Sequence, residues 1–222
     1  IPDSVTTIGD CAFAGCTSLT SITIPDSVTT IGYQAFYNCD SLTSVHISDL
    51  TAWCNIEFKS GDANPLWDGA KLYLNDNLVT DLVIPNGVES INSYAFTGSG
   101  LTSVTLPDSV TSIGDSAFKY CYELSSIDIP DSVTYIGSDA FYVCRSLTSV
   151  TFENTSGWKY SDYSDCTNGT EIDVTDEEQN ATYLTDSYKD YYWYRVLTED
   201  VINTNVYSYK LDIEDISTAY GG

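Results

Sequence analysis

The only histidine in the 222-residue chain is His46, so any acid–base, nucleophilic or metal chemistry that needs an imidazole must use it. It follows Ser44 by two residues in a run of alternating polar and apolar residues, so we expect a solvent-facing ring on a half-buried strand. The sequence has no second histidine for a metal cluster, no glycine-rich phosphate loop and no Asp-x-Asp-x-Asp-Gly calcium loop. It therefore predicts no catalytic residue, no metal site and no cofactor.

Carboxylates are abundant, with 32 Asp and Glu residues against 8 Lys and Arg residues and a formal net charge of −24. Some pair of acids always lies close at this density, so a carboxylate pair alone does not indicate glycoside hydrolysis. One acidic segment has the composition of a calcium site, but we interpret it as a solvated loop: Glu171, Asp173, Asp176, Glu177 and Glu178. Nucleic acid and anionic membranes are poor partners because binding phosphates needs clustered Lys and Arg. No apolar run approaches the roughly 18 residues that span a bilayer.

Cysteine is the remaining residue type with chemical potential, and the chain has seven. Four of them recur at intervals of 23 residues within two pairs: Cys16 and Cys39, and Cys121 and Cys144. A periodic cysteine is typical of a small buried apolar residue. Those outside this register are Cys11, Cys54 and Cys166. A Cys54–Cys166 or a Cys11–Cys54 disulfide is compatible with the sequence, whereas the lack of a CxxC pair argues against zinc.

A repeated block of 22 or 23 residues must position all of these side chains. The segment Ile1-Pro2-Asp3-Ser4-Val5 recurs with small changes in copies that begin at Ile24, Ile84, Leu106 and Ile129. A fixed short period indicates stacked units, none of which can bury its apolar face alone. The sequence therefore predicts a solenoid in which long crossovers join successive parallel strands.

Each coil should begin with a strand such as 21–24, where Ile22 and Ile24 alternate with outward polar residues. Pro25 should end that strand because proline cannot donate to a ladder. A second short strand follows at 28–31. A residue that tolerates positive φ comes next; in the five copies it is Gly9, Gly32, Asn92, Gly114 and Gly137.

The rest of each coil should form one or two helical turns. A good N-cap residue, such as Asp10 or Asp115, precedes an Ala-Phe pair in most copies. The phenylalanines are Phe13, Phe36, Phe96, Phe118 and Phe141. We expect these rings and the periodic cysteines to face inward, each ring stabilising the fold by roughly 1.5–3 kcal/mol through burial.

The full pattern Ile-Pro-Asp-Ser-Val-Thr-x-Ile-Gly-x-x-Ala-Phe-x-x-Cys-x-x-Leu-Thr-Ser-Val-x-Ile resembles the BspA-like leucine-rich repeat family over residues 1–152. The resemblance implies a leucine-rich repeat solenoid, and in this sequence an irregular insertion at 47–83 interrupts the repeats. It also implies a secreted or cell-surface protein of host-associated bacteria, with adhesion as the usual inference. The chain opens inside a repeat and lacks a starting Met, so we interpret it as a piece of a longer protein whose signal peptide lies elsewhere.

The insertion at 47–83 is too long for one standard coil. Ser48-Asp49 should cap a short helix that carries Leu50, Trp53 and Cys54. Residues 72–74 and 79–84 both have strand character, and we expect them to pair as a hairpin across a turn at 75–77. A projecting ligand arm that bears Trp53 and Trp67 is the functional alternative.

The tail at 153–222 loses the repeat and holds 10 of the 18 tyrosines. A solenoid must cover its open end, and terminal units are atypical for that reason. We therefore interpret 153–222 as a Tyr-rich, acidic C-terminal cap. The alternative is a carbohydrate platform, because aromatic faces stack on sugar rings; its residues would be Trp67, Trp158, Tyr191, Tyr192 and Trp193.

The function that these features favour is non-enzymatic binding of a protein at a cell surface. The outward strand positions are Ser21, Thr23, Ser44, His46, Ser103, Thr105, Ser126, Asp128, Ser149 and Thr151. As contact residues we single out Thr23, Ser44, His46, Thr105, Asp128 and Thr151. The alternatives are a carbohydrate-binding module that uses the aromatic platform and a passive spacer with no ligand. Fold alone does not decide among them.

Overall fold

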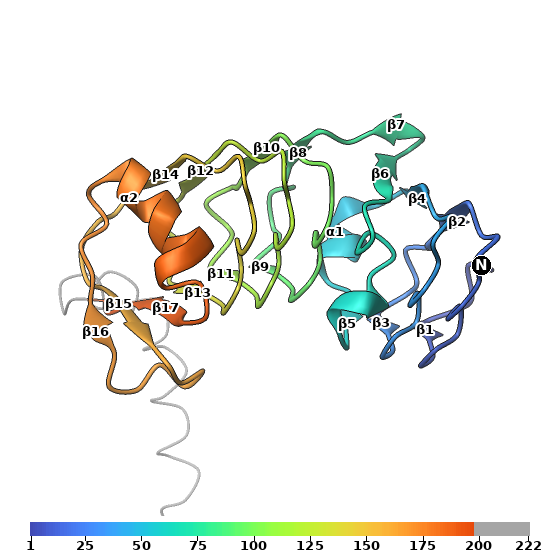
Figure 1. Cartoon of the computed structure of the whole chain (residues 1–222), viewed down its shortest axis with the longest axis horizontal. Coiled ribbons are helices and arrows are strands. Elements are labelled where there is room, and N and C mark those ends of the chain that lie inside the picture. Colours follow the sequence, from blue (N-terminus) through green and yellow to red (C-terminus); the bar gives the residue numbers. More distant parts are fainter. Residues whose placement is uncertain (198–222) are drawn as a thin grey trace, which may run out of the picture.

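The computed structural model describes residues 1–197 and shows an elongated stack of coils, each with one short strand on each of two faces (Figure 1). The first face, called the strand face below, consists of β2 (Ser21–Thr23), β4 (Ser44–Ile47), β6 (Lys71–Leu74), β8 (Asp81–Val83), β10 (Ser103–Thr105), β12 (Ser126–Ile129) and β14 (Ser149–Phe152). The second face consists of β1 (Thr7–Ile8), β3 (Thr30–Ile31), β5 (Glu57–Phe58), β9 (Ser90–Ile91), β11 (Ser112–Ile113) and β13 (Tyr135–Ile136). The predicted parallel-strand solenoid is confirmed.

The register between coils equals one sequence period. Ile22 pairs with Val45 in one sheet, and Ile127 pairs with Val150 in another. Equivalent positions of successive coils therefore lie side by side, and identical residue types form rows through the stack. Phe118 shows the consequence, because its ring stacks on Phe96 and on Phe141 with centroid distances of 5.5 Å in both cases. These rings lie in the core as predicted, since Phe96, Phe118 and Phe141 are fully buried.

The segment after the second strand forms consecutive tight turns where helical turns were expected. In the first coil, the amides of Ala12 and Cys16 donate to carbonyls three residues earlier, while those of Cys11 and Phe13 donate to the next coil. This alternation is possible because two residues in this segment of each of the five repeat copies adopt left-handed φ, such as Cys11 at 55° and Gly15 at 71°. The turns thus form a third ladder of hydrogen bonds between coils.

The predicted role of the glycines after the second strand of each repeat copy is wrong, because Gly9, Gly32, Gly114 and Gly137 do not have positive φ. Close approach requires glycine at Gly32, Gly114 and Gly137 instead: a methyl group on Gly32 would lie 2.3 Å from Asp10 Oδ1, whereas one on Gly9 would have no atom within 4 Å. Asp10 likewise caps no helix, since its carboxylate accepts a hydrogen bond of 2.8 Å from Tyr33 N of the next coil.

The periodic cysteines are buried at Cys39, Cys121 and Cys144, whereas Cys16 in the first coil is exposed. The thiols of the three buried cysteines donate to the carbonyl of the phenylalanine in the preceding coil, as Cys144 Sγ does to Phe118 O at 3.1 Å. All seven cysteines are unpaired, so neither disulfide left open by the sequence is formed. Burial raises the pKa of the Cys54 thiol to about 12 and keeps it protonated.

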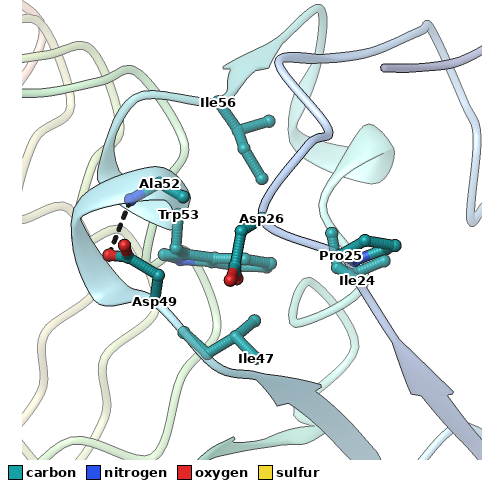
Figure 2. Close-up of a pocket in the computed structure, with 8 residues that line it drawn as sticks. All are labelled: Ile24, Pro25, Asp26, Ile47, Asp49, Ala52, Trp53 and Ile56. Carbon is teal, nitrogen blue, oxygen red and sulfur yellow. Dashed lines mark hydrogen bonds between the residues drawn. The ribbon is translucent and has the colours of Figure 1, made fainter. Parts of the chain in front are cut away.

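The interruption of the repeat contains the predicted short helix, α1 (Leu50–Cys54). Asp49 caps it, accepting hydrogen bonds from Thr51 N and Ala52 N, and Leu50, Trp53 and Cys54 are buried. Figure 2 shows the Trp53 ring extending from α1 between hydrophobic side chains of the insertion toward the Pro25–Asp26 turn. Trp53 is only 1% exposed, so the idea of a projecting arm that carries it is wrong.

A 3₁₀ turn, η1 (Gly61–Ala63), and a tight hairpin complete the insertion. The hairpin joins β6 to β7 (Asn77–Leu78) through Asn75 and Asp76, whose φ values of 49° and 63° suit Asn and Asp. The predicted hairpin therefore exists, but its second strand is not 79–84. Residues 81–83 form β8, which instead pairs in parallel with β10 and opens a second sheet.

The solenoid consequently consists of two stacks of coils. Strands β2, β4, β6 and β7 form one sheet of the strand face, and β8, β10, β12 and β14 form another. The second face divides in the same way, because β5 ends one sheet and β9 begins the next. The helix α1 lies between the two stacks (Figure 1).

The residues after β14 cover the end of the second stack, as the predicted aromatic cap should. Its elements are β15 (Trp158–Ser161), β16 (Thr170–Glu171), α2 (Glu177–Thr182), the π-helical turn η2 (Tyr183–Ser187) and β17 (Tyr192–Arg195). Strand β17 pairs antiparallel with β13, and α2 lies over β14 (Figure 1). The part of the predicted cap after residue 197 lies outside the described residues. No helix within 1–197 has the length and apolar character needed to cross a membrane.

Candidate binding surface

The outward side chains of the strand face form two rows, because parallel register repeats each position from coil to coil. The first row contains Ser21, Ser44, Lys71, Asp81, Ser103, Ser126 and Ser149. The second row contains Thr23, His46, Tyr73, Val83, Thr105, Asp128 and Thr151. The inward residues between the rows are buried, so the strands hold the rows at fixed spacing over a rigid core.

The six predicted contact residues all lie on this face, but in two groups. Thr23, Ser44 and His46 belong to the sheet of the first stack, whereas Thr105, Asp128 and Thr151 belong to that of the second. The gap between β6 and β8 separates the groups, so they do not form one continuous sheet.

His46 is half-buried, with a side chain that is 27% exposed. Its ring stacks on Tyr73 at 4.8 Å between centroids and 11° between planes. Its Nδ1 lies 3.0 Å from Asp76 Oδ1 in the hairpin turn. The ring therefore faces outward as predicted, but its two partners orient it, and the pair of rings forms the main aromatic feature of the strand face.

The polar residues at the start of the second stack form hydrogen bonds with one another. Asp81 accepts hydrogen bonds from Ser103 Oγ at 2.6 Å, Thr80 Oγ1 at 3.2 Å and Thr102 Oγ1 at 3.3 Å. The bonds from Ser103 and Thr80 are the main reason that the pKa of Asp81 is lowered, so the carboxylate is ionised at neutral pH. This position of the strand face carries a fixed negative charge.

Sequence reasoning missed Lys71, Tyr73, Asp81 and Val83, which continue the two rows through the interruption. The sequence did contain a signal for Asp81 and Val83. They stand three residues and one residue before Ile84-Pro85, just as Ser21 and Thr23 stand before Ile24-Pro25. Lys71 and Tyr73 follow no repeat motif, and only the pairing of β6 with β4 places them in the rows.

The far end of the strand face is bounded by the cap. Ser149 Oγ donates to Glu177 Oε2 at 3.0 Å. In the same helix, Asn180 is fully buried, and its Nδ2 donates at 2.9 Å to Val150 O of β14 and to Val174 O. Helix α2 thus occupies the free edge of the last strand.

Most aromatic residues of the alternative carbohydrate platform are packed within the cap or against the end of the solenoid. Trp158 and Trp193 are 2% and 1% exposed, and both contact Phe152 at the end of the solenoid. Neither can stack on a sugar while the cap is folded, so their proposed role as platform residues is wrong. Tyr191 and Tyr192 are half-buried; Tyr192 lies against Tyr135 of the solenoid.

Trp67, the remaining platform residue, lies in the insertion and contacts Tyr120 edge-on at 5.4 Å between centroids. It lines an open hollow of about 370 Å³ together with Lys71, Tyr122 and Glu123. The structure therefore does not bring the five platform residues together, because Trp67 lies apart from the cap.

The acidic segment near the cap has structural partners. Asp176 caps α2, and Asp173 accepts hydrogen bonds from Thr175. Within residues 1–197, no three His, Cys, Asp or Glu side chains converge in a way that suits a metal ion.

A family model described as a BspA type leucine rich repeat region matches residues 1–61 and 69–187 in six copies. No curated protein sequence matches the chain. Among solved structures, a leucine rich cell surface protein from Faecalibacterium prausnitzii A2-165 is 33% identical with a TM-score of 0.40, over 72% of this chain and 45% of that one.

Two further structures show the same kind of likeness. A leucine-rich repeat protein from Eubacterium ventriosum ATCC 27560 is 25% identical with a TM-score of 0.45, over 68% of this chain and 52% of that one. The pneumococcal vaccine antigen PcpA is 22% identical with a TM-score of 0.33, over 67% and 32%. The chain spans about half the length of the first two proteins and about a third of the last.

Proposed function

Because the chain belongs to the BspA-type leucine-rich repeat family, we propose that it is a non-enzymatic interaction protein that binds a protein partner along the strand face. The observation that carries this proposal is the parallel register, which aligns two rows of small polar side chains with a few larger ones. A repetitive, rigid surface of this kind loses little conformational entropy on binding, which favours association.

A protein partner fits this surface better than a glycan. Two rings of the aromatic platform are buried in the cap, whereas the strand face offers the His46–Tyr73 pair and outward hydroxyl groups. Tyrosine and hydroxyl side chains are typical of adaptable protein interfaces. The site of action in this proposal is the cell surface or the secreted medium, in line with the cell-surface protein that the chain resembles.

The test is to measure binding of the 222-residue chain to an array that carries extracellular-matrix proteins and glycans at physiological salt. For a protein that binds, the affinity of the His46→Arg/Asp128→Arg double variant is then compared with that of wild type. Asp108→Arg is the matched control, because it makes the same charge change as Asp128→Arg at an exposed turn outside the two rows.

A loss of at least tenfold in the double variant, with Asp108→Arg unchanged, would support the strand face as the site. A protein hit whose affinity is unchanged in the double variant would show that the strand face is not the site. Hits among glycans alone would favour the carbohydrate-binding alternative, and silence from the whole array would favour the passive spacer.

A further inference from the structure

A groove of about 400 Å³ crosses the strand face at the gap between the two stacks. The hairpin forms one wall with Leu74 and Leu78, β8 forms the other with Leu82 and Val83, and Leu50 of α1 also lines it. The insertion creates this groove, because β6 bonds to β7 and leaves the neighbouring position beside β8 without a strand. Figure 1 shows the hairpin apart from β8, with α1 between the two stacks.

The strand β8 has a free edge on the groove side. Among residues 1–197 it has one hydrogen-bonded neighbour, β10. Ile84 N donates to Thr105 O of the coil that contains β10, at 3.0 Å. Since backbone groups alternate sides along a strand, Leu82 also faces β10, while the N–H and C=O groups of Asp81 and Val83 face the groove. An unpaired edge of this kind is a template for an added strand.

The groove also concentrates exposed aliphatic surface. Val83 is 63% exposed and Leu78 is 44% exposed. Within the described part of the chain, Val196 is the only other large aliphatic side chain with comparable exposure. Exposed apolar side chains that gather beside an open strand edge, rather than scattering, are typical of an interaction site.

The charge of the groove is negative. Asp81 lines it, Asp76 in the adjacent turn has a side chain that is 91% exposed, and no Lys or Arg lines the groove. The bonds from Ser103 and Thr80 fix the Asp81 carboxylate at the strand edge. Lys or Arg side chains of a ligand are attracted to these two carboxylates, which favours binding. The net charge of −24 adds long-range attraction.

We propose that this groove binds an extended basic segment of a protein partner by strand addition to β8, with apolar side chains of that segment against Leu78 and Val83. This inference deepens the proposed function, on which it rests, by naming a site within the strand face and the chemistry of the partner. Backbone bonds to Asp81 and Val83 supply the alignment, and the apolar and basic side chains supply the selectivity.

Two other occupants are disfavoured by charge. A second copy of the chain would bring another net charge of −24 to the groove. The remaining residues of this chain, 198–222, contain five Asp and Glu residues against one Lys. Both would repel the groove, whereas a basic segment neutralises it.

The test starts from a display library of random 12-residue peptides selected on the wild-type protein. Enriched sequences should place apolar residues at alternate positions and carry several Lys or Arg residues. The affinity of a synthetic copy is then measured by fluorescence anisotropy for wild type, Val83→Asp and Leu78→Asp. Val196→Asp is the matched control, because Val196 is 47% exposed and lies in the cap, outside the groove and the two rows. Melting temperatures confirm that all variants are folded.

We expect Val83→Asp and Leu78→Asp each to weaken binding at least tenfold while Val196→Asp changes it less than threefold. Methylation of alternate backbone nitrogens of the peptide should also weaken binding at least tenfold. No enrichment, enrichment of acidic peptides, or insensitivity to N-methylation would overturn strand addition. Loss of peptide binding in the His46→Arg/Asp128→Arg double variant but not in Val83→Asp would overturn the groove while preserving the strand face as a site, and loss in neither would count against both.

Discussion

Gly32 lies where two coils touch, and it shows how tightly a single residue is constrained by the stack. A β-carbon at this position would lie 2.3 Å from Asp10 Oδ1 and 2.5 Å from Asp10 N. Gly137 meets Asp115 at the same two distances. Asn92 is accepted at this position in the first coil of the second stack, where its Nδ2 reaches back to Ile56 O at 3.2 Å.

The variant Gly32→Ala should lower the free energy of unfolding by about 1–3 kcal/mol, because the added methyl group forces the two coils apart. Gly9→Ala is the matched control, since it has the same repeat position and no atom within 4 Å of the added carbon. That control should stay within about 0.5 kcal/mol of wild type. Urea unfolding followed by circular dichroism measures both, and equal effects would refute the close-approach explanation.

Asp115 should make the protein less stable as pH rises. Burial is the main reason that its pKa is raised; the hydrogen bond from Ser138 N opposes this rise, and the charge of Asp139 adds a smaller one. Above 3.8, the ordinary pKa, the unfolded chain loses its proton first and the folded chain holds it. The folded state then binds more protons, so the free energy of unfolding falls with pH through this window and stays reduced above it.

The variant Asp115→Asn keeps an oxygen that can accept from Ser138 N and removes the charge, so its advantage over wild type should grow between pH 3 and 7. Asp131→Asn should do the opposite, because hydrogen bonds from Arg195 and Asn154 lower the pKa of Asp131. Urea unfolding at several pH values checks both signs. A difference between Asp115→Asn and wild type that does not vary with pH would contradict this account.

Individual side chains differed in how well the sequence predicted them. The buried phenylalanines and the capped helix with Trp53 follow from periodicity and local chemistry, which the sequence contains. The close approach at Gly32 depends on the neighbouring coil, and a sequence window around residue 32 contains no sign of it. The same holds for Tyr73, which reaches the strand face only because β6 pairs with β4.

At the scale of elements, α2 illustrates how an open strand edge is closed. Asn180 is the residue that joins this helix to β14, through its bonds of 2.9 Å to Val150 O and Val174 O. The π-helical turn that follows and β17 complete the cap. The sequence predicted a cap from the aromatic content of 153–222, but its topology depends on pairings between distant segments that no local pattern encodes.

The variant Asn180→Ala should lower the free energy of unfolding by about 1–3 kcal/mol, since it leaves two buried carbonyls without a donor. Gln179→Ala is the control, because Gln179 is exposed in the same helix. Urea unfolding measures the loss, and hydrogen exchange should show faster exchange in β14 of the Asn180 variant alone. Equal stability of the two variants would mean that the helix is held by other contacts.

The hairpin shows an element that the sequence predicted only in part. The turn residues Asn75 and Asp76 signalled a reversal, and the reversal occurs there. The sequence did not show whether residues 81–83 extend the hairpin by pairing with β6 or pair with the later strand β10, as they do in the structure. Forward pairing gives the second stack its first strand and buries Leu82, which a longer hairpin would not do.

On the scale of the whole molecule, the described chain consists of two solenoid stacks that share one hydrophobic core but no sheet. No sheet in residues 1–197 continues from one stack to the other. The hydrogen bonds across the junction include those from Trp53 Nε1 to Ala95 O at 2.9 Å and from Asn64 Nδ2 to Tyr94 O at 2.7 Å and to Ala95 O at 3.0 Å. Asn92 adds two more, from its N to Cys54 O at 3.3 Å and from its Nδ2 to Ile56 O at 3.2 Å. Because solenoid units couple mainly to their neighbours, the stability of the molecule should depend on this junction.

The variant Asn64→Ala should weaken the coupling between the two stacks. Asn64 is 1% exposed, and its Oδ1 also accepts from Leu66 N at 2.8 Å, so the variant leaves several buried groups unpaired and should lower the free energy of unfolding by about 2–4 kcal/mol. Hydrogen exchange measured by mass spectrometry should then show β2 and β4 opening before β10 and β12, since pairing of β17 with β13 and packing of α2 on β14 stabilise the second stack. Asn86→Ala, at an exposed turn, should leave the exchange of both stacks unchanged. Equal acceleration of exchange in both stacks of the Asn64 variant would show that they unfold as one cooperative unit, with coupling that does not depend on this residue.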